Sequence, residues 1–276
     1  MSITAVEIKK VVLDEDDFGH EMRVGNILNN VEYPQNYYEF TRVMPPHHGG
    51  TYTDRVTGKT RQFDFRCQIV KGENPVLSIY LAVECKNLNA DLPLVVCGRP
   101  RTVEESYHAF LQLETPKPNV LPVWLRKKDG FNSIYQPDQF VGKSLLRLKK
   151  KQNEICAEGD SEIYDRWAQA LASSHDLADR AFDENLPQKS CAFVMPLVVV
   201  PDNSLWIVSY KDDGTPDADP IKVDKCEFYV EQKLNLSSMP QLVLTHIHFV
   251  TLKGLSQMLA DFVAPRTRTW KRIFGT

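Results

Sequence analysis

Cysteine is sparse in this sequence, and its spacing excludes several kinds of site. The six cysteines never lie closer than twelve positions apart, so no CxxC pair is present that could form half of a zinc site or a thiol redox centre. No run approaches the roughly 20 apolar residues that a membrane helix needs. The N-terminus also lacks a basic region followed by an apolar one. These absences predict a cytoplasmic protein with reduced thiols and no membrane partner.

Acidic and basic residues nearly balance in number, but they are unevenly distributed along the chain. The formal net charge is only −3, which argues against a protein that coats nucleic acid. Between Lys117 and Asn153, however, nine basic residues stand against two acidic ones, and the tail from Val263 to Thr276 has four basic residues and no acid. Two basic segments on an acidic body could bind a polyanion, although such runs are also typical of a solvated face.

The chain shows no internal repeat and no low-complexity linker, so we expect one elaborated domain over residues 1–276. Capping residues and apolar spacing predict helices at 14–30, 160–182 and 252–263, with a further helix at 102–113. Apolar runs and alternation predict strands that include 61–70, 77–87, 192–200, 204–210, 226–232 and 244–251. Residues 37–50 are expected to be a strand ending in a loop of Pro and Gly.

A carboxylate and an ammonium stand at the end of the apolar run 77–87. Residues two apart in a strand share a face, so Glu84 and Lys86 project together. If this strand forms a hairpin with 61–70, Asp64 belongs to the same polar face. Mg²⁺ prefers such oxygen ligands and usually takes one or two carboxylates from the protein. The alternative interpretation is a functionally silent surface ion pair between Glu84 and Lys86.

These residues resemble a known family. Asp64, nineteen intervening residues and then Glu84-Cys85-Lys86 is similar to the motif of the PD-(D/E)XK, or restriction-endonuclease-like, superfamily, although the family's "PD" is here Phe63-Asp64. The resemblance implies an α/β fold whose core is a helix, three strands, a helix and a strand, with a mixed central sheet flanked by helices. The core would comprise 16–88 and 160–210, with an insertion at 89–159 after the third strand and a C-terminal extension at 211–276.

The resemblance also implies roles for individual residues. Asp64 and Glu84 would bind Mg²⁺, with Mn²⁺ as a substitute, together with the backbone carbonyl of Cys85, and Lys86 would be catalytic. Glu21 in the first helix and Gln169 in the helix after the third strand are further catalytic candidates. Glu21 is equally explained as an acid favoured by the helix dipole, and Gln169 as a packing or capping amide.

The function implied is a Mg²⁺-dependent nuclease that cuts DNA, with a homodimer expected by resemblance alone. Two groups of basic residues would grip the phosphates: Arg126, Lys127 and Lys128 in one, and Arg147, Lys149, Lys150 and Lys151 in the other. One alternative is a catalytically inactive binding or scaffold subunit with a nuclease fold, in a nucleic-acid processing or defence assembly. Another is an RNA-processing nuclease.

Two histidine pairs allow other metal sites. His47 and His48 lie in the expected Pro and Gly loop, without an evident third ligand. His246 and His248 share one face of an expected strand, but closed zinc sites usually need four ligands. We therefore expect strand histidines whose hydrogen bonds are satisfied by the fold.

Overall fold

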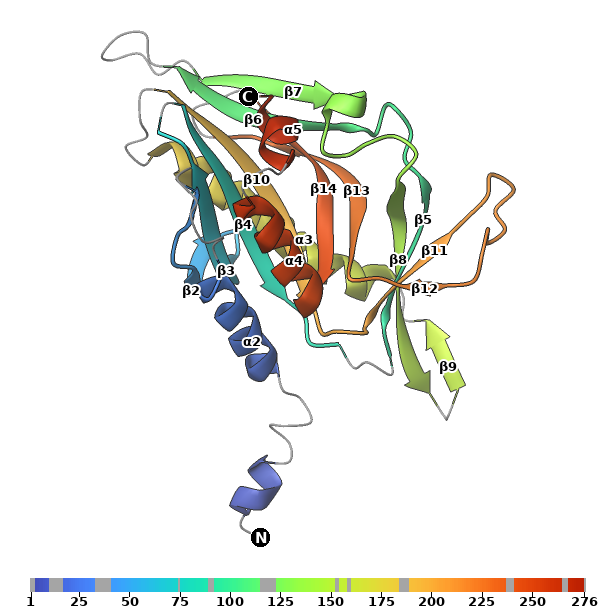
Figure 1. Cartoon of the computed structure of the whole chain (residues 1–276). Coiled ribbons are helices and arrows are strands. Elements are labelled where there is room, and N and C mark those ends of the chain that lie inside the picture. The colour runs from blue at the N-terminus through green and yellow to red at the C-terminus, as the bar shows by residue number, and fades with distance from the viewer. Residues whose placement is uncertain are drawn as a thin grey trace.

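The computed structural model of the chain describes residues 3–9, 17–32, 41–73, 75–88, 92–114, 123–151, 154–157, 160–183, 189–236, 241–264 and 268–275 (Figure 1). Its helices are α2 (Asp17–Asn29), η1 (Gly130–Asn132), α3 (Asp160–Asp183), α4 (Leu252–Val263) and α5 (Thr269–Phe274). Its strands are β1 (Thr41–Val43), β2 (His47–Thr53), β3 (Thr60–Lys71), β4 (Val76–Cys85), β5 (Leu94–Pro100), β6 (Tyr107–Glu114), β7 (Val123–Asp129), β8 (Phe140–Lys151), β9 (Glu154–Ala157), β10 (Lys189–Val200), β11 (Leu205–Ser209), β12 (Ile221–Lys222), β13 (Lys225–Leu234) and β14 (Leu242–Thr251).

The strands of the described residues form a single mixed sheet. Its continuous order is β1-β3-β4-β10-β14-β13-β8-β5-β11-β12, with β2 beside β3, β6 between β10 and β7, and β9 beside β8. The N-terminal half of β10 pairs with β6 and its C-terminal half with β14, so the sheet branches along this central strand. Because β10 has neighbours on both edges, its near-continuous apolar sequence is what a fully buried strand requires.

The predicted fold class is wrong. We expected a restriction-endonuclease-like core in which helices flank a small sheet, but the described chain is a mixed sheet of 14 strands with few helices. The expected insertion at 89–159 contributes β5 to β9, and the expected extension at 211–276 contributes β12 to β14. These segments pair with the central strands, since isolated short strands cannot satisfy their backbone groups or bury an apolar face alone.

Two local predictions are also wrong. Residues 102–113 were expected to be helical, yet Tyr107–Glu114 is strand β6, paired with β10 on one edge and β7 on the other. The expected loop around the two histidines is part of β2, whose residues His47–Thr53 pair with β3. In both cases, pairing with a distant or flanking strand supplies backbone hydrogen bonds that local propensity does not anticipate.

The predicted hairpin and the predicted long helix are confirmed. β3 and β4 pair antiparallel, with Phe65 opposite Val83. Helix α3 covers the predicted segment, and the chain returns from it into β10, which runs parallel to β4 with Val198 opposite Glu84. Segment 252–263 is helical as expected, as α4.

Two apolar layers cover the sheet. On one face, α3 packs over a core that includes Ala82, Leu111 and Ile247. On the other face, α2, α4 and α5 cover a core that includes Ile79, Leu81 and Leu197 (Figure 1). Each fully buried Leu or Ile contributes roughly 1.5–3 kcal/mol. The two layers hold β3, β4 and β10 rigidly, and the polar residues of interest lie at the ends of these strands.

A long apolar helix is absent from the described residues: none of their helices meets the length and hydropathy needed to cross a membrane.

Candidate functional site

Asp64 and Glu84 lie on adjacent strands at the same end of the β3–β4 hairpin. The register pairs Phe65 with Val83, and one further position places Asp64 opposite Glu84 on the same face. The Asp64 Oδ2 atom accepts a hydrogen bond from the backbone N–H of Cys85 at 2.6 Å. This bond fixes the aspartate against the last residue of β4, so the fold itself holds the two carboxylates together.

Lys86 completes this end of the hairpin. Its Nζ atom donates to Glu84 Oε1 at 2.5 Å, and its backbone N–H donates to the carbonyl of Val199 at 2.8 Å. The side chain of Glu84 is only 2% exposed, whereas that of Lys86 is 23% exposed. The carboxylate therefore sits in the wall of the core, and the lysine connects it to solvent.

Burial controls the protonation of the two carboxylates. Burial raises the pKa of Glu84 to about 7; the positive charge of Lys86 opposes this rise and the negative charge of Asp64 adds to it. Burial also raises the pKa of Asp64, against the hydrogen bond from Cys85. Both carboxylates are thus held in an environment that disfavours their negative charge, and a nearby cation would relieve that cost.

Glu21 reaches the same site from helix α2. His20, Val24, Gly25 and Leu28 bury one face of this helix against the sheet, and Glu21 stands at the edge of that face. The charge of Glu21 raises the pKa values of both Asp64 and Glu84, which places its carboxylate within electrostatic range of the pair. Glu21 therefore acts on the Asp64–Glu84 pair through its charge.

His48 is a member of this site that the sequence did not assign. Its Nε2 atom lies 3.4 Å from Glu21 Oε2, and its ring stacks on Phe65, the residue after Asp64, with centroids 4.4 Å apart. Because His48 was expected in a loop, its approach to Glu21 could not be foreseen. The pairing of β2 with β3 brings them together.

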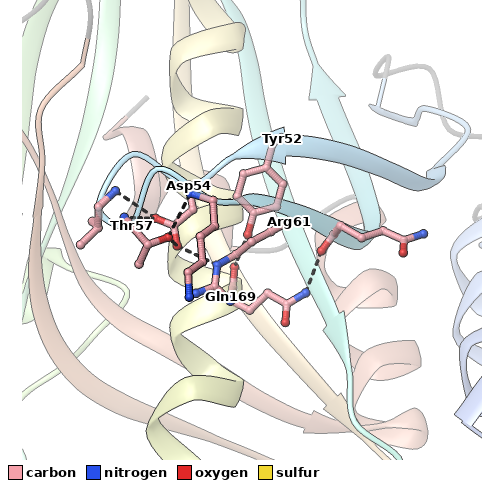
Figure 2. A network of polar contacts seen from close by, with 8 residues as sticks. Tyr52, Asp54, Thr57, Arg61 and Gln169 are labelled. Carbon is pink, nitrogen blue, oxygen red and sulfur yellow. Dashed lines mark hydrogen bonds and ion pairs between the residues drawn. The ribbon is translucent and has the colours of Figure 1, made fainter.

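Gln169 is used to join α3 to the β2–β3 hairpin. Its side-chain Nε2 donates to the carbonyl of Gln62 at 2.7 Å, and its backbone carbonyl accepts from the hydroxyl of Tyr52 at 3.3 Å. Figure 2 shows these contacts beside the Asp54 carboxylate, which binds Arg61 and Thr57 in the same hairpin. These contacts of Gln169 are those of a packing amide. Its partner on β3, Gln62, lies two positions before Asp64.

The donor set suits a cation that keeps part of its water shell. Glu84 Oε2 is buried and makes no hydrogen bond to any described residue, and leaving such an oxygen unsatisfied is costly. No group of three or more His, Cys, Asp or Glu side chains within the described part of the chain is arranged to enclose a metal ion. The described residues therefore do not by themselves form a complete metal cage. Mg²⁺ usually takes one or two protein carboxylates and retains several waters, so the carboxylates of Asp64 and Glu84 are the groups that could hold it.

The two basic segments lie in different places. Arg126, Lys127 and Lys128 are on β7, which crosses the top of the molecule in Figure 1, whereas the C-terminal end of β4 points to the bottom. On β7, Arg126 Nε donates to Gln112 and Lys127 Nζ lies 4.2 Å from the centre of the Tyr107 ring. These two side chains are therefore engaged with β6, far from Glu84.

The second segment lies on β8 and reaches the candidate site. Arg147 and Lys86 line a common cavity of about 40 Å³, whose other walls are apolar and include Trp167 and Phe249. Lys150 is exposed further along the same strand. The backbones of Lys149 and Lys151 belong to β8, but their side chains lie outside the described part of the structure.

The second histidine pair belongs to a buried aromatic cluster. Tyr135 stacks on His246 with centroids 3.7 Å apart, and its hydroxyl lies 2.8 Å from His248 Nε2. Burial lowers the pKa of His248 to about 4. The expectation of satisfied strand histidines holds only in part, because the buried Nε2 atom of His246 has no hydrogen-bond partner among the described residues.

Comparison of the chain with protein-family models, with curated proteins and with solved structures found no match.

Proposed function

We propose that this protein is a Mg²⁺-dependent phosphodiester hydrolase with an active site of the PD-(D/E)XK type, acting as a DNA endonuclease. The observation that carries the proposal is the convergence of Asp64, Glu84 and Lys86 at one end of β3 and β4. The support comes from this constellation and not from the fold as a whole, which is much richer in strands.

Asp64 and Glu84 are the residues that would hold the divalent cation, with the backbone carbonyl of Cys85 as a third oxygen donor. When bound, Mg²⁺ or Mn²⁺ supplies positive charge against the phosphodiester and lowers the pKa of a coordinated water. The unsatisfied Oε2 atom of Glu84 is the feature of this chain that fits the role best.

Lys86 has the position needed for proton handling and charge stabilisation. Its Nζ atom is in contact with Glu84 and accessible to solvent, so it can hold an attacking water beside the carboxylates or stabilise negative charge developing on phosphorus. Glu21 and His48 are paired with each other on α2 and β2, and the charge of Glu21 acts on both carboxylates.

DNA, rather than RNA, is proposed from the family resemblance. The basic residues of β8 favour a polyanionic substrate, because Arg147 and Lys86 line one small apolar cavity and so belong to the same region of the molecule. The two basic segments are proposed to contribute unequally, since Arg126 and Lys127 on β7 are bound to β6 and lie away from the carboxylates.

Cleavage of supercoiled plasmid tests the proposal. Wild-type protein is expected to nick or linearise the plasmid with Mg²⁺ or Mn²⁺ and to be inactive in EDTA. Asp64→Ala, Glu84→Ala and Lys86→Ala should each lose at least 100-fold in rate, the usual scale for a catalytic acid–base or electrostatic group. Glu104→Ala and Lys59→Ala are matched controls at exposed positions and should cleave as the wild type does.

Two outcomes would overturn the assignment. One is activity like that of the wild type in any of the three site variants, provided that each retains its far-ultraviolet circular dichroism spectrum. The other is the absence of cleavage of plasmid, single-stranded DNA and RNA by pure protein, which would favour an inactive binding or scaffold subunit.

A further inference from the structure

The strands β8 and β9 form a two-stranded ribbon that extends beyond the main sheet. Residues of β8 up to Arg147 pair with β5. From Leu148 to Lys151, β8 pairs only with Glu154–Ala157 of β9 among the described strands. Figure 1 shows the ribbon projecting from the lower right of the molecule. We use "the ribbon" for residues 148–151 and 154–157.

The ribbon carries positive charge on a protein that is otherwise acidic. Its residues 148–151 and 154–157 contain three basic residues and one acidic residue, whereas the whole chain has a net charge of −3. A polyanion approaching the molecule is therefore attracted to this projection, as it is to the basic residues of β7.

One face of the ribbon presents a cation beside an apolar side chain. Lys150 is directly opposite Ile155, so the two project on the same face. Lys150 is exposed, and Ile155 is 66% exposed although it is large and apolar. A lysine donates to guanine O6 and N7, and an apolar side chain contacts the thymine methyl group, both of which lie in the major groove.

The dimensions of the ribbon match that groove. Four residues of β-strand rise by roughly 10 Å from first to last, and the major groove of B-DNA is about 8.5 Å deep and about 12 Å wide, enough for a two-stranded ribbon. The base of the ribbon also adjoins the candidate active site, since Arg147 lines a cavity with Lys86. A duplex held by the ribbon would thus pass close to the carboxylates.

We propose that the β8–β9 ribbon enters the major groove of double-stranded DNA and positions the duplex over Asp64, Glu84 and Lys86. This inference rests on the proposed nuclease function and specifies its substrate as duplex DNA. Lys150 and Ile155 contact base edges, and Arg147 contacts the backbone near the site of cleavage.

Binding without cleavage tests the ribbon separately from catalysis. The affinity of full-length protein in EDTA for a fluorescent 30-base-pair duplex would be measured by anisotropy. Lys150→Glu should weaken binding at least tenfold and reduce the slope of log affinity against log salt. Lys59→Glu makes the same charge change at an exposed position outside both basic segments and should alter affinity less than threefold. Ile155→Ser should weaken binding to a T-containing duplex more than to the same duplex with uracil.

Groove competitors complete the experiment. Methyl green, which occupies the major groove, should displace the protein, and netropsin, which occupies the minor groove, should not. Equal effects of Lys150→Glu and Lys59→Glu, displacement by netropsin alone, or no binding to the duplex would overturn the proposal. So would loss of self-association in Ile155→Ser with unchanged DNA binding, because the ribbon would then be a protein contact.

The two proposals fail in distinguishable ways. Duplex binding that depends on Lys150, without any cleavage, would refute the nuclease and leave the ribbon intact. Cleavage that depends on Glu84, with binding insensitive to Lys150, would refute the ribbon alone.

Discussion

Glu84 is a carboxylate buried at the end of an otherwise apolar strand, which is unusual for a group that serves only stability. Its side chain is 2% exposed, and its Oε2 atom makes no hydrogen bond to a described residue. The single partner of its other oxygen, Lys86, does not offset the burial, because the pKa of Glu84 is still raised to about 7. The residue therefore costs stability, and a cation bound to it would supply the missing partner of Oε2.

We predict that Mg²⁺ stabilises the folded protein without DNA. A ligand that binds only the folded state adds about 1.4 kcal/mol at ten times its dissociation constant, a rise of roughly 2–5 °C in Tm for a chain of this size. Differential scanning fluorimetry over a Mg²⁺ titration would measure it. Glu84→Gln and Asp64→Asn should abolish the rise, and Glu104→Gln should keep it. An equal rise in all four proteins would exclude these carboxylates as the binding site.

His108 makes the fold sensitive to acid. Its Nε2 atom lies 2.9 Å from the carbonyl of Ile273, so that nitrogen carries the proton, and its Nδ1 atom accepts from the hydroxyl of Ser133 at 2.9 Å. Burial lowers the pKa of His108 to about 4 from an ordinary value of 6.5. A proton added to Nδ1 would break the bond from Ser133 and place a charge in the core.

The sign of the pH effect follows from the lowered pKa. Between pH 6.5 and about 4 the unfolded chain binds more protons at this residue than the folded chain, so stability falls as pH falls. The contribution of neutral His108 to the free energy of unfolding is complete above pH 6.5. About 3 kcal/mol of this free energy is lost when the pH reaches 4. Urea unfolding between pH 7.5 and 4.5 should show a weaker pH dependence in His108→Gln than in wild type. Parallel curves for the two proteins would contradict the prediction.

At the scale of elements, the first turn of α4 is joined closely to the residue before β13. Thr251 caps the helix by accepting from the N–H of Gly254 at 3.1 Å, and it donates from its own N–H to the carbonyl of Asp224 at 2.9 Å. A Cβ atom on Gly254 would lie only 1.9 Å from that carbonyl oxygen. The glycine is required by this close approach.

Gly254→Ala should therefore destabilise the protein. The alanine would force α4 away from Asp224, and overpacking of this kind costs about 1–3 kcal/mol. Chemical unfolding would measure the loss. Ser256→Ala, at an exposed position two residues along the same helix, should change stability by no more than about 0.5 kcal/mol. Because alanine has a higher helix propensity than glycine or serine, a stability of Gly254→Ala equal to or above that of the wild type would contradict the prediction.

Elements also differ in how far local sequence determines them. Helix α3 and strands β3, β4 and β10 were predicted because each has a strong period or a long apolar run. Strand β6 was mistaken for a helix, since residues 102–113 carry a plausible cap and spaced apolar residues. Its state was decided by β10 and β7 on its two edges. Pairing energy from distant strands is not encoded in a short window.

At the scale of the whole molecule, the sheet is assembled from segments far apart in the chain. β10 joins β4, β6 and β14, which brings together residues from four widely separated parts of the sequence. This arrangement explains why the prediction of a core limited to 16–88 and 160–210 was wrong. The strands of 89–159 and 211–276 belong to the same sheet as the strands of that core. It also separates the basic segment of β7 from that of β8.

The sequence by itself determined the hairpin that carries Asp64, Glu84 and Lys86, because alternation and an apolar run are local properties that select strands and their faces. The contributions of Glu21 and His48, the bond from Gln169 to β3, the position of Arg147 beside Lys86 and the projecting ribbon were decided only by the tertiary structure. Each depends on contacts between residues distant in sequence, whose geometry is set by packing and strand pairing across the whole sheet.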